Sequence, residues 1–550
     1  MLLWFSPVGL ESVVSLPQGD ARGKIDQTVY GDRYFSFEGL PYAMPPVGNL
    51  RFQPPVPPPC WTGPRNFFTP GNKSIQKNWQ TGTVEGSEDC LYLNVYTKEL
   101  YGTVKMPVIV FIHGGSYNSG GAVRESFSPD YFMLKDVVLV TFNYRLGCLG
   151  FLSLKDPDLE VPGNNGIKDM ILALRWVKNN IILFNGDPEK IAVCGMAAGA
   201  AAVHYLMCTP HAKDLFQRAI LMAGCTLNYW ASMPQKDFAF RLAKLNGYKG
   251  VDDDASVLRF LSKIPAEALV DQWLLTTEEL EDGYVFAFGP VIEPYITSET
   301  LIPTRPVDML RQSWGNCIPL ILGGTSFEGL YAFPLLLSHP ELVQQMKGQP
   351  QNILPYDARE GHSEEFCLQL SKHLIQKHFG KGAHNSTDEQ SLLDYMDFVS
   401  YKNFWHGLHR TTLSRVYYTN CPTYLYRFDF YSRFNQQRHL LLSNQGIHAK
   451  GAAHGDELSY LFFSSTSWPL KRQSPEFINI TRMIAIWTSF ADSGRPKCPE
   501  LNNIRVHWHP LRVNKVFQAL NIGKKLEFIE IPERAKLEAW NDCYEPEQLY

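Results

Sequence analysis

The run from Lys190 to Pro210 constrains this chain more than any other stretch. A short apolar, β-branched segment leads into Gly195-Met-Ala-Ala-Gly199, and an alanine-rich segment follows. This order predicts a strand, a tight turn and a helix. That is the setting of a nucleophile elbow, in which the central residue of Gly-x-Ser-x-Gly is held on a strained turn with its side chain exposed. The central residue here is Ala197, so the sequence predicts the turn without its nucleophile.

Composition places few limits on the rest. The chain has 550 residues, of which 45% are hydrophobic and 19% charged, as in globular proteins with a large core. A net charge of −4 gives no reason to expect a nucleic-acid partner, and no apolar run is long enough to form a transmembrane segment. Without a linker or repeat to divide the chain, we expect an N-terminal extension over residues 1–22 and a single domain over residues 23–550.

Periodicity indicates the fold class. The apolar runs Val108–Ile112 and Val137–Phe142 predict central strands buried on both faces. Leu91–Tyr96 alternates as a half-buried strand does, and Gly166–Asn180 has apolar residues at helical spacing. Gly186-Asp-Pro188 predicts a break before the elbow strand, and further strands are expected at Phe216–Ala223, Pro319–Gly323 and Tyr424–Phe430. The alternation predicts an α/β fold, with a mostly parallel central sheet flanked by helices and long insertions between later strands.

A glycine pair follows the first of these central strands. Val108–Ile112 ends in His113-Gly-Gly115. Glycines let the backbone turn so that N–H groups converge on one point, as an oxyanion hole requires. Gly114 and Gly115 are therefore candidate donors, and the N–H of Ala198, after the nucleophile position, would be the third. An ordinary loop is the alternative for this glycine pair.

Short motifs spread along the chain carry a family resemblance. They are Phe37-Glu-Gly-Leu-Pro-Tyr-Ala43, Ser87-Glu-Asp-Cys-Leu-Tyr-Leu-Asn-Val-Tyr96, His113-Gly-Gly115, Asn143-Tyr-Arg-Leu-Gly147, Gly163-Asn-Asn-Gly166, Ala173-Leu-Arg-Trp-Val177, Gly186-Asp-Pro188, Pro290-Val-Ile-Glu-Pro294 and His454-Gly-Asp-Glu-Leu458. From about Gly23 onward the chain resembles the type-B carboxylesterases of the carboxylesterase/cholinesterase family, and within it the insect α-esterases. The resemblance implies an α/β-hydrolase fold and a serine esterase site that needs no cofactor.

The same resemblance assigns two partners to the nucleophile position. Gly324-Thr-Ser-Phe-Glu-Gly329 matches the motif of the family's acid, which gives Glu328, and the motif of its base gives His454. The order position 197, Glu328, His454 is that of α/β-hydrolases. His454 would take the nucleophile's proton, while Glu328 would fix the imidazole tautomer and stabilise the imidazolium.

Other residues match the family in less direct roles. Trp230 resembles the rim of the family's acyl pocket, with core packing as the alternative. Arg51 with Glu88, and Arg145 with Asp169, resemble its buried ion pairs. No Cys-x-x-Cys occurs, so a structural zinc site is not expected, and we predict no metal and no cofactor.

The cysteines depart from the family pattern. Cys90 matches half of a family disulfide, but Ser74 stands where its partner would be; Cys60 is a substitute whose pairing stays open. A second bridge would fall near Tyr248 and Phe260, where no cysteine occurs. Missing bridges favour an intracellular protein. Secretion is the alternative, on the sequons at Asn72, Asn385 and Asn479, although the apolar segment Met1–Leu10 lacks the basic residues of a signal peptide.

Three functions follow from the missing serine. The first is a catalytically deficient carboxylesterase homologue that retains a pocket for a small carboxylic ester and acts by ligand sequestration or protein binding. The second is an active ester hydrolase with a Ser-Glu-His triad, in which alanine has been substituted for serine. The third is hydrolysis by water that His454 activates directly.

Overall fold

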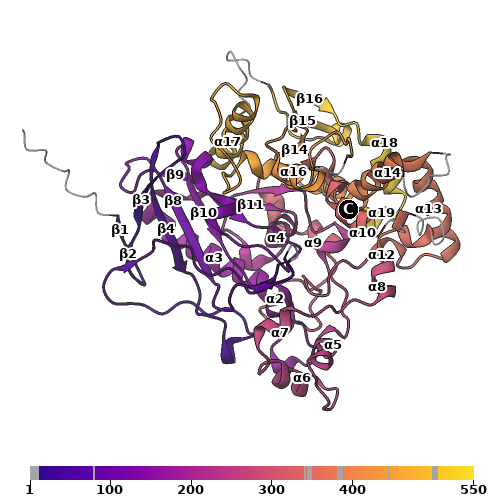
Figure 1. The fold of residues 1–550 in the computed structure, drawn as a ribbon, viewed down its shortest axis with the longest axis horizontal. Helices are drawn as coiled ribbons and strands as arrows, with labels where there is room; N and C mark the ends of the chain where they lie inside the picture. Colours follow the sequence, from indigo (N-terminus) through magenta and orange to yellow (C-terminus); the bar gives the residue numbers. More distant parts are fainter. Residues whose placement is uncertain are drawn as a thin grey trace, which may run out of the picture.

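The structure is a computed structural model that describes residues 12–78, 81–339, 342–343, 350–380, 388–443, 446–497 and 506–550. The segment Met1–Leu10, considered above as a signal peptide, lies outside these ranges. Within them an 11-stranded sheet crosses the molecule (Figure 1). Its spatial order is β16 (Leu526–Glu530), β15 (Gln518–Ile522), β14 (Thr423–Phe428), β13 (Leu320–Thr325), β12 (Arg218–Met222), β11 (Gly186–Met196), β9 (Met106–Ile112), β10 (Val138–Phe142), β8 (Tyr92–Thr97), β4 (Arg33–Pro41) and β3 (Lys24–Gln27).

The centre of the sheet is parallel and its edges are antiparallel. Every pairing from β10 through β9, β11, β12, β13 and β14 to β15 is parallel. Strands β8, β4 and β3 at one edge, and β16 at the other, are antiparallel to their neighbours. The predicted mostly parallel sheet is confirmed, and each expected strand overlaps a strand of this sheet.

Helices cover both faces of the sheet. Alternate residues of β9 enter different cores: Val108 and Val110 join the core with α3 (Asn165–Asn180) and α4 (Ala198–Cys208), whereas Ile109 and Phe111 join the core with α17 (Pro475–Ser493). The prediction of central strands buried on both faces is therefore correct. In the part of the chain that is described, no helix is long and apolar enough to cross a bilayer.

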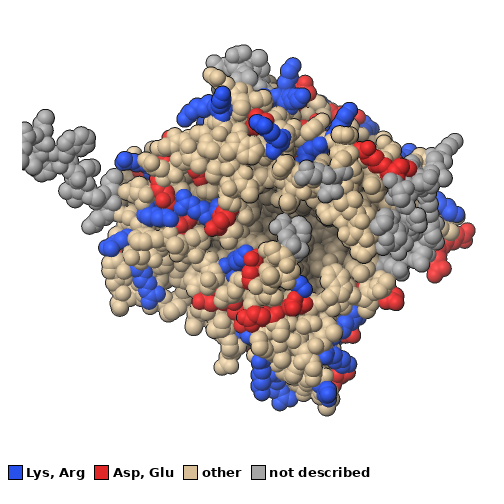
Figure 2. Space-filling model, viewed as in Figure 1, with Lys and Arg blue, Asp and Glu red and all other residues tan. Residues whose placement is uncertain are grey.

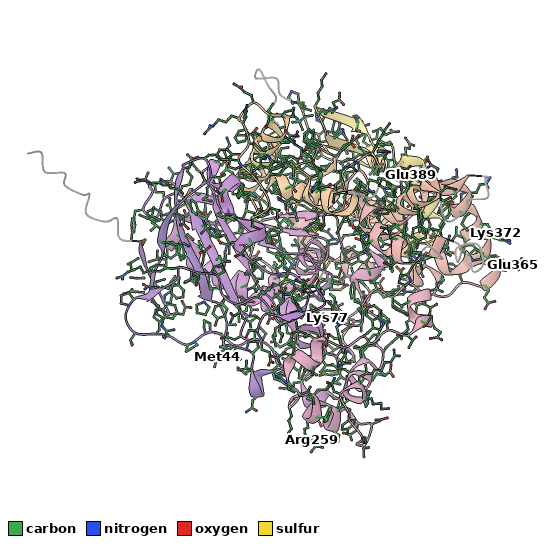
Figure 3. All side chains as sticks on the ribbon, viewed as in Figure 1. Met44, Lys77, Arg259, Glu365, Lys372 and Glu389 are labelled. Atoms are coloured by element: carbon green, nitrogen blue, oxygen red, sulfur yellow. The ribbon has the colours of Figure 1, made fainter. Side chains whose placement is uncertain are left out.

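Two long insertions extend from the sheet, and the larger part of each forms a bulge of its own in Figure 1. One lies between β12 and β13, and the other between β13 and β14; the charged side chains Glu365 and Lys372 point outward from the edge of the second (Figure 3). The helices of the first are α5 (Phe238–Leu245), α6 (Asp254–Leu261), α7 (Ala266–Val270), α8 (Thr277–Glu281) and α9 (Pro306–Arg311). Those of the second are α10 (Phe333–Ser338), α12 (Tyr356–Arg359), α13 (Glu364–Phe379), α14 (Glu389–Ser400), a π-helix (Tyr401–Trp405) and α15 (His406–Tyr418).

The remaining elements are short. Two small sheets are formed by β1 (Val13–Leu16), β2 (Gly19–Arg22) and β5 (Arg65–Asn66), and by β6 (Gln76–Lys77) and β7 (Val84–Glu85). The β1–β2 hairpin, within the expected N-terminal extension, buries Val14, Leu16 and Ala21. The other α-helices are α1 (Arg124–Phe127), α2 (Gly147–Phe151), α16 (Gln436–Leu442), α18 (Arg534–Asn541) and α19 (Pro546–Leu549).

Two local predictions are wrong. Gly186-Asp-Pro188 does not break the chain before the elbow strand, because β11 begins at Gly186 and a register shift between Gly186 and Ile191 takes Pro188 out of the ladder. The strand predicted over Leu91–Tyr96 is not half-buried. It is β8, covered on both faces, and only Tyr92 of the strand keeps part of its surface.

Cysteines and sequons also have defined positions. Cys60 is an exposed thiol and Cys90 a buried one, and both are free. Burial raises the pKa of Cys90 to about 12, and Ser74, at the position of the missing partner, donates its hydroxyl hydrogen bond to the Tyr144 carbonyl. The sequon Asn72 is exposed, whereas Asn479 is 1% exposed and its amide donates to the Pro475 carbonyl; Asn385 lies outside the described residues.

Candidate active site

Ala197 occupies a strained turn between β11 and α4. The strand ends at Met196 and the helix begins at Ala198, with Ala197 at φ 52° and ψ −119° between them. A non-glycine residue in such a conformation costs about 1–3 kcal/mol and persists only where its surroundings impose it. The backbone N–H of Ala197 donates to the Met222 carbonyl on β12 at 2.8 Å, which fixes one side of the turn. The predicted strand–turn–helix is therefore present.

Glycines allow the backbones around this turn to approach one another. A Cβ at Gly199 would lie 2.2 Å from the Ile112 carbonyl oxygen, and one at Gly195 would lie 2.3 Å from the Gly199 oxygen. A Cβ at Gly224 would lie 2.2 Å from the Ala197 oxygen. Real side chains never come so close, so these three positions require glycine whatever residue stands at position 197.

The glycine loop after β9 lies against the turn. A Cβ at Gly114 would be 3.3 Å from the Ala197 Cβ, which places this loop beside the nucleophile position. Gly115 has φ +109° and forms a tight turn in which the N–H groups of Asn118 and Ser119 donate to its carbonyl. Ala198 opens α4, where the first backbone N–H groups of a helix have no intrahelical acceptor. Gly114 and Ala198 therefore flank Ala197, and Gly115 follows in the same loop.

His113 supports this loop. Its ring is stacked on Tyr144 with centroids 4.5 Å apart, and its Nδ1 lies 2.8 Å from the Gly114 carbonyl oxygen. Burial lowers the pKa of His113 to about 4, so the imidazole is neutral at physiological pH. The Tyr144 hydroxyl in turn donates to the His113 carbonyl at 3.0 Å. The pair holds the glycine loop in place.

Glu328 and His454 form a hydrogen-bonded pair. The Glu328 Oε2 lies 2.5 Å from the His454 Nδ1, and its Oε1 accepts from the Thr325 N–H at 2.6 Å. Glu328 is fully buried, whereas the His454 side chain keeps 16% of its surface exposed. With Nδ1 committed to the carboxylate, the imidazole has Nε2 free to accept a proton, which is the arrangement of an oriented general base.

Aromatic rings cover His454. The Phe404 ring lies 4.3 Å from the imidazole and the Tyr331 ring 5.8 Å from it, centroid to centroid. Trp230 lies one ring further out, 6.1 Å from Phe404, and its Nε1 donates to the Asn403 carbonyl at 2.6 Å. Trp230 is only 6% exposed, so it packs behind the ring that covers the histidine.

Sequence reasoning missed Asn403, Phe404 and Tyr331. The first two lie on the π-helix Tyr401–Trp405, and a π-helical turn inside a helical segment often marks a functional site. The residues that Asn403 and Phe404 contact lie far from them along the chain, so no local periodicity points to these contacts. The signal that could have been used is the aromatic cluster Tyr401-Lys-Asn-Phe-Trp405 itself.

Met196 and Glu457 complete the surroundings of the turn. The Met196 thioether lies between the glycine loop and the loop that carries His454, since a Cβ at Gly114 would be 3.2 Å from its sulfur and one at Gly455 would be 2.7 Å from its methyl carbon. Glu457 is fully buried, and its Oε1 accepts from the Tyr426 hydroxyl at 3.3 Å. Burial, assisted by the nearby Glu328, holds the pKa of Glu457 well above its usual range.

The predicted ion pairs Arg51–Glu88 and Arg145–Asp169 are formed. Arg51 Nη2 lies 2.5 Å from Glu88 Oε2, and Arg145 Nη2 lies 2.7 Å from Asp169 Oδ1, with the second pair almost wholly buried. Among the residues that the structure describes, no group of three or more His, Cys, Asp or Glu side chains is placed to hold a metal ion.

The parallel sheet, the strained turn after its central strand and the Glu–His pair on later loops together define an α/β-hydrolase. Comparison with known proteins agrees. The sequence profile of the Carboxylesterase family matches residues 10–540. Esterase B1 of Culex pipiens is 34% identical over 548 residues, covering 99% of this chain and 100% of the relative. A juvenile hormone esterase of Tribolium castaneum is 30% identical over 524 residues, covering 90% and 85%.

A solved structure supports the same assignment. The crystal structure of juvenile hormone esterase from Manduca sexta, with OTFP covalently attached, superimposes with a TM-score of 0.83 at 26% identity, covering 97% of this chain and 99% of that one. The chain therefore belongs to the carboxylesterase family, and insect esterases are among its relatives, as the motifs predicted.

Proposed function

We propose that this chain is a catalytically deficient carboxylesterase homologue that binds a carboxylic ester and does not turn it over. The observation that carries this proposal is Ala197 on an intact elbow, with φ 52° and the glycine loop beside its Cβ. A methyl group at this position cannot attack a carbonyl. In serine hydrolases, loss of the nucleophile lowers kcat by about 10⁶, or about 8 kcal/mol of barrier.

The remaining groups would still receive an ester. In this proposal the N–H groups of Gly114, Gly115 and Ala198 bind the carbonyl oxygen, and Glu328 holds His454 beside it. The 2.5 Å contact between Glu328 and His454 supports this role. Donors and binding alone accelerate hydrolysis by only about 10³–10⁴-fold over water, so a bound ester would persist. The function that fits is sequestration of a small carboxylic ester, with Trp230 in the pocket wall.

One experiment separates this proposal from an esterase that works without serine. The unmodified protein is mixed with a short aryl ester, and binding is measured by calorimetry while release of the aryl alcohol is followed by absorbance. In parallel the protein is treated with a radiolabelled organophosphate. We expect the ester to bind and the organophosphate to leave no covalent label. We expect no ester hydrolysis above the rate of a variant that lacks His454. Turnover at ordinary esterase rates, or stoichiometric labelling, would refute the proposal.

We also propose an intracellular location and a single domain over residues 23–550. Cys60 and Cys90 are free thiols, which are typical of proteins in a reducing compartment. Asn479 is too deeply buried to accept a glycan in the folded protein. Exposed Asn72 leaves secretion as the alternative. Expression in a secretory cell line tests this, since a glycan on Asn72, together with a stable secreted product, would contradict the intracellular assignment.

A further inference from the structure

A cavity opens beside α16 that the candidate active site does not account for. It has a volume of about 440 Å³, which is within the range of small-molecule sites in proteins. Its walls come from the segment before the helix, from the helix itself and from the segment after it, and they include Tyr431, Arg433, Arg438, His439, Leu442 and Ile447. The nucleophile position, the Glu–His pair and the glycine loop contribute none of its lining.

The lining of this cavity is cationic. It contains two arginines and a histidine but no carboxylate, and a guanidinium stays charged at any physiological pH. Arg433 is exposed, and within the described ranges no ion pair engages it. Two carboxylates adjoin the lining residues, but both accept from backbone N–H groups: Asp456 from Arg438 at 3.1 Å, and Glu389 from His448 at 2.7 Å. The cavity itself therefore presents positive charge to a ligand.

Arg438 is held in one position by the protein. Its Nη1 donates to the Gly451 carbonyl at 2.8 Å, and its Nη2 donates to the Ala449 carbonyl at 2.5 Å. Its Cζ lies 4.9 Å from the centre of the Tyr431 ring, as in a cation–π contact. A guanidinium has five N–H donors, so these two bonds leave three for other acceptors. An arginine that is already fixed loses little conformational freedom when it binds an oxyanion.

An apolar wall accompanies these cations. Tyr431 is 39% exposed although its ring packs on Arg438, and Leu442 and Ile447 line the same cavity. Figure 2 shows basic side chains in the upper part of this face, where α16 lies in Figure 1, above the hollow near the centre. Cationic donors beside an accessible ring suit a ligand that has an oxyanion at one end and a flat apolar group at the other.

We propose that this cavity binds an aromatic phosphate monoester, with the phosphate on Arg433 and Arg438 and the aromatic group on Tyr431. Arginine presents its N–H groups in a planar fork that matches phosphate oxygens. A phosphate monoester is close to a dianion at pH 7.5, and two guanidinium groups match a dianion better than a singly charged sulfate ester or carboxylate. The inference goes beyond the proposed function and does not depend on it, because the cavity and the candidate active site share no residue.

Matched anions test the charge and the ring separately. Binding of phenyl phosphate, phenyl sulfate and inorganic phosphate to the full chain is measured by calorimetry at pH 7.5. We expect phenyl phosphate to bind at least about tenfold more tightly than phenyl sulfate, which has the same ring and a single charge; this is the scale of one charge-assisted hydrogen bond. Tyr431→Ser should remove the advantage of phenyl phosphate over inorganic phosphate, because the phenyl group then has no ring to pack on.

Substitutions locate the bound phosphate. Arg433→Gln and Arg438→Lys should each weaken phenyl phosphate binding by about tenfold, the second because lysine keeps the charge but lacks the fork. Arg433 is exposed, so Arg433→Gln should keep the thermal unfolding midpoint of the unmodified protein, and it decides the test if Arg438→Lys fails to fold. Arg259→Gln is the matched control, because Arg259 is exposed and lies at the opposite end of the molecule from α16 (Figure 3); its affinity should change by less than about twofold.

Three results would overturn the inference. The first is a failure of the unmodified protein to bind phenyl phosphate. The second is an affinity that survives both arginine substitutions. The third is binding that is lost in His454→Ala and kept in Arg433→Gln, since this would place the phosphate in the candidate active site. None of these results bears on whether the protein binds an ester without turning it over.

Discussion

Replacing Ala197 by serine should convert this protein into an esterase. The substitution adds one oxygen to a Cβ that already lies beside Gly114. It needs no backbone movement, because Ala197 already has φ 52° and ψ −119°, and any strain in that conformation is present before and after the change. The proposed general base is also in place, since Glu328 binds the His454 Nδ1 at 2.5 Å.

The expected increase in kcat/KM follows from what the nucleophile contributes in serine hydrolases. In serine hydrolases the nucleophile is worth about 10⁶ in kcat, or about 8 kcal/mol. Full recovery would require a pocket suited to the chosen ester, and here Met196 lies between the glycine loop and the loop that carries His454. We therefore expect kcat/KM for a short aryl ester to rise by about 10³–10⁶-fold, the lower end being about 4 kcal/mol.

The assay is initial-rate hydrolysis combined with organophosphate labelling of the Ala197→Ser variant. Labelling should become stoichiometric and should map to position 197. The double variant Ala197→Ser/His454→Ala is the control, and it should return to the rate of the unmodified protein. A folded Ala197→Ser variant that neither hydrolyses the ester nor takes up label would show that the oxyanion loop or the base is not positioned for chemistry.

Three further predictions concern the base, the core and the pH dependence. In the unmodified protein, His454→Ala should leave background ester hydrolysis unchanged within about twofold; a larger fall, with binding intact, would mean that the histidine activates water directly. Asp169→Ala should destabilise the fold by about 3–5 kcal/mol and lower the midpoint of thermal unfolding by about 3–4 °C, because it leaves the buried Arg145 charge without its partner. The control is Asp136→Ala, at a surface ion pair, which should change the free energy of unfolding by less than about 0.5 kcal/mol. Equal effects of the two substitutions would contradict this reasoning. Burial raises the pKa of Asp456 to about 6, so its stabilising contribution is present below the unfolded pKa of about 4 and is lost as the pH rises through 6. Between pH 4 and 7 the unmodified protein should therefore lose about 2 kcal/mol more stability than Asp456→Asn, as measured by urea denaturation, and parallel curves would contradict this.

Elements with strong local patterns could be predicted from the sequence. The apolar runs that became β9 and β10 are continuous because both faces of those strands are covered, and such runs need no knowledge of the partner. The helix predicted over Gly166–Asn180 begins one residue earlier, at Asn165. The elbow was identifiable because its glycines occupy fixed positions around the turn, where any side chain would collide with backbone.

Features that depend on distant contacts could not be predicted in this way. Phe404 covers His454 from a position far away in the sequence, and nothing in the residues around either one encodes the 4.3 Å approach of their rings. The place of Pro188 within a strand could not be predicted for a related reason, since only the pairing of β11 with β9 reveals the register shift that accommodates it. Buried polar groups such as Glu457 also gave no sequence signal, because their burial is a property of the assembled fold.

The elbow is determined by its neighbours and not by the residue at its centre. Gly195, Gly199 and Gly224 are required by backbone approaches of 2.2–2.3 Å that would exist with alanine or serine at position 197. The Ala197 N–H is anchored to the Met222 carbonyl in the same way for either residue. Fold stability and activity are therefore separable here. Ala197→Ser should leave the free energy of unfolding within about 0.5 kcal/mol of its original value, because the change is local and creates no cavity or buried charge. It follows that loss of the serine removes the chemistry while the fold, the glycine loop and the Glu328–His454 pair persist, which is the condition under which a binding protein can arise from an esterase.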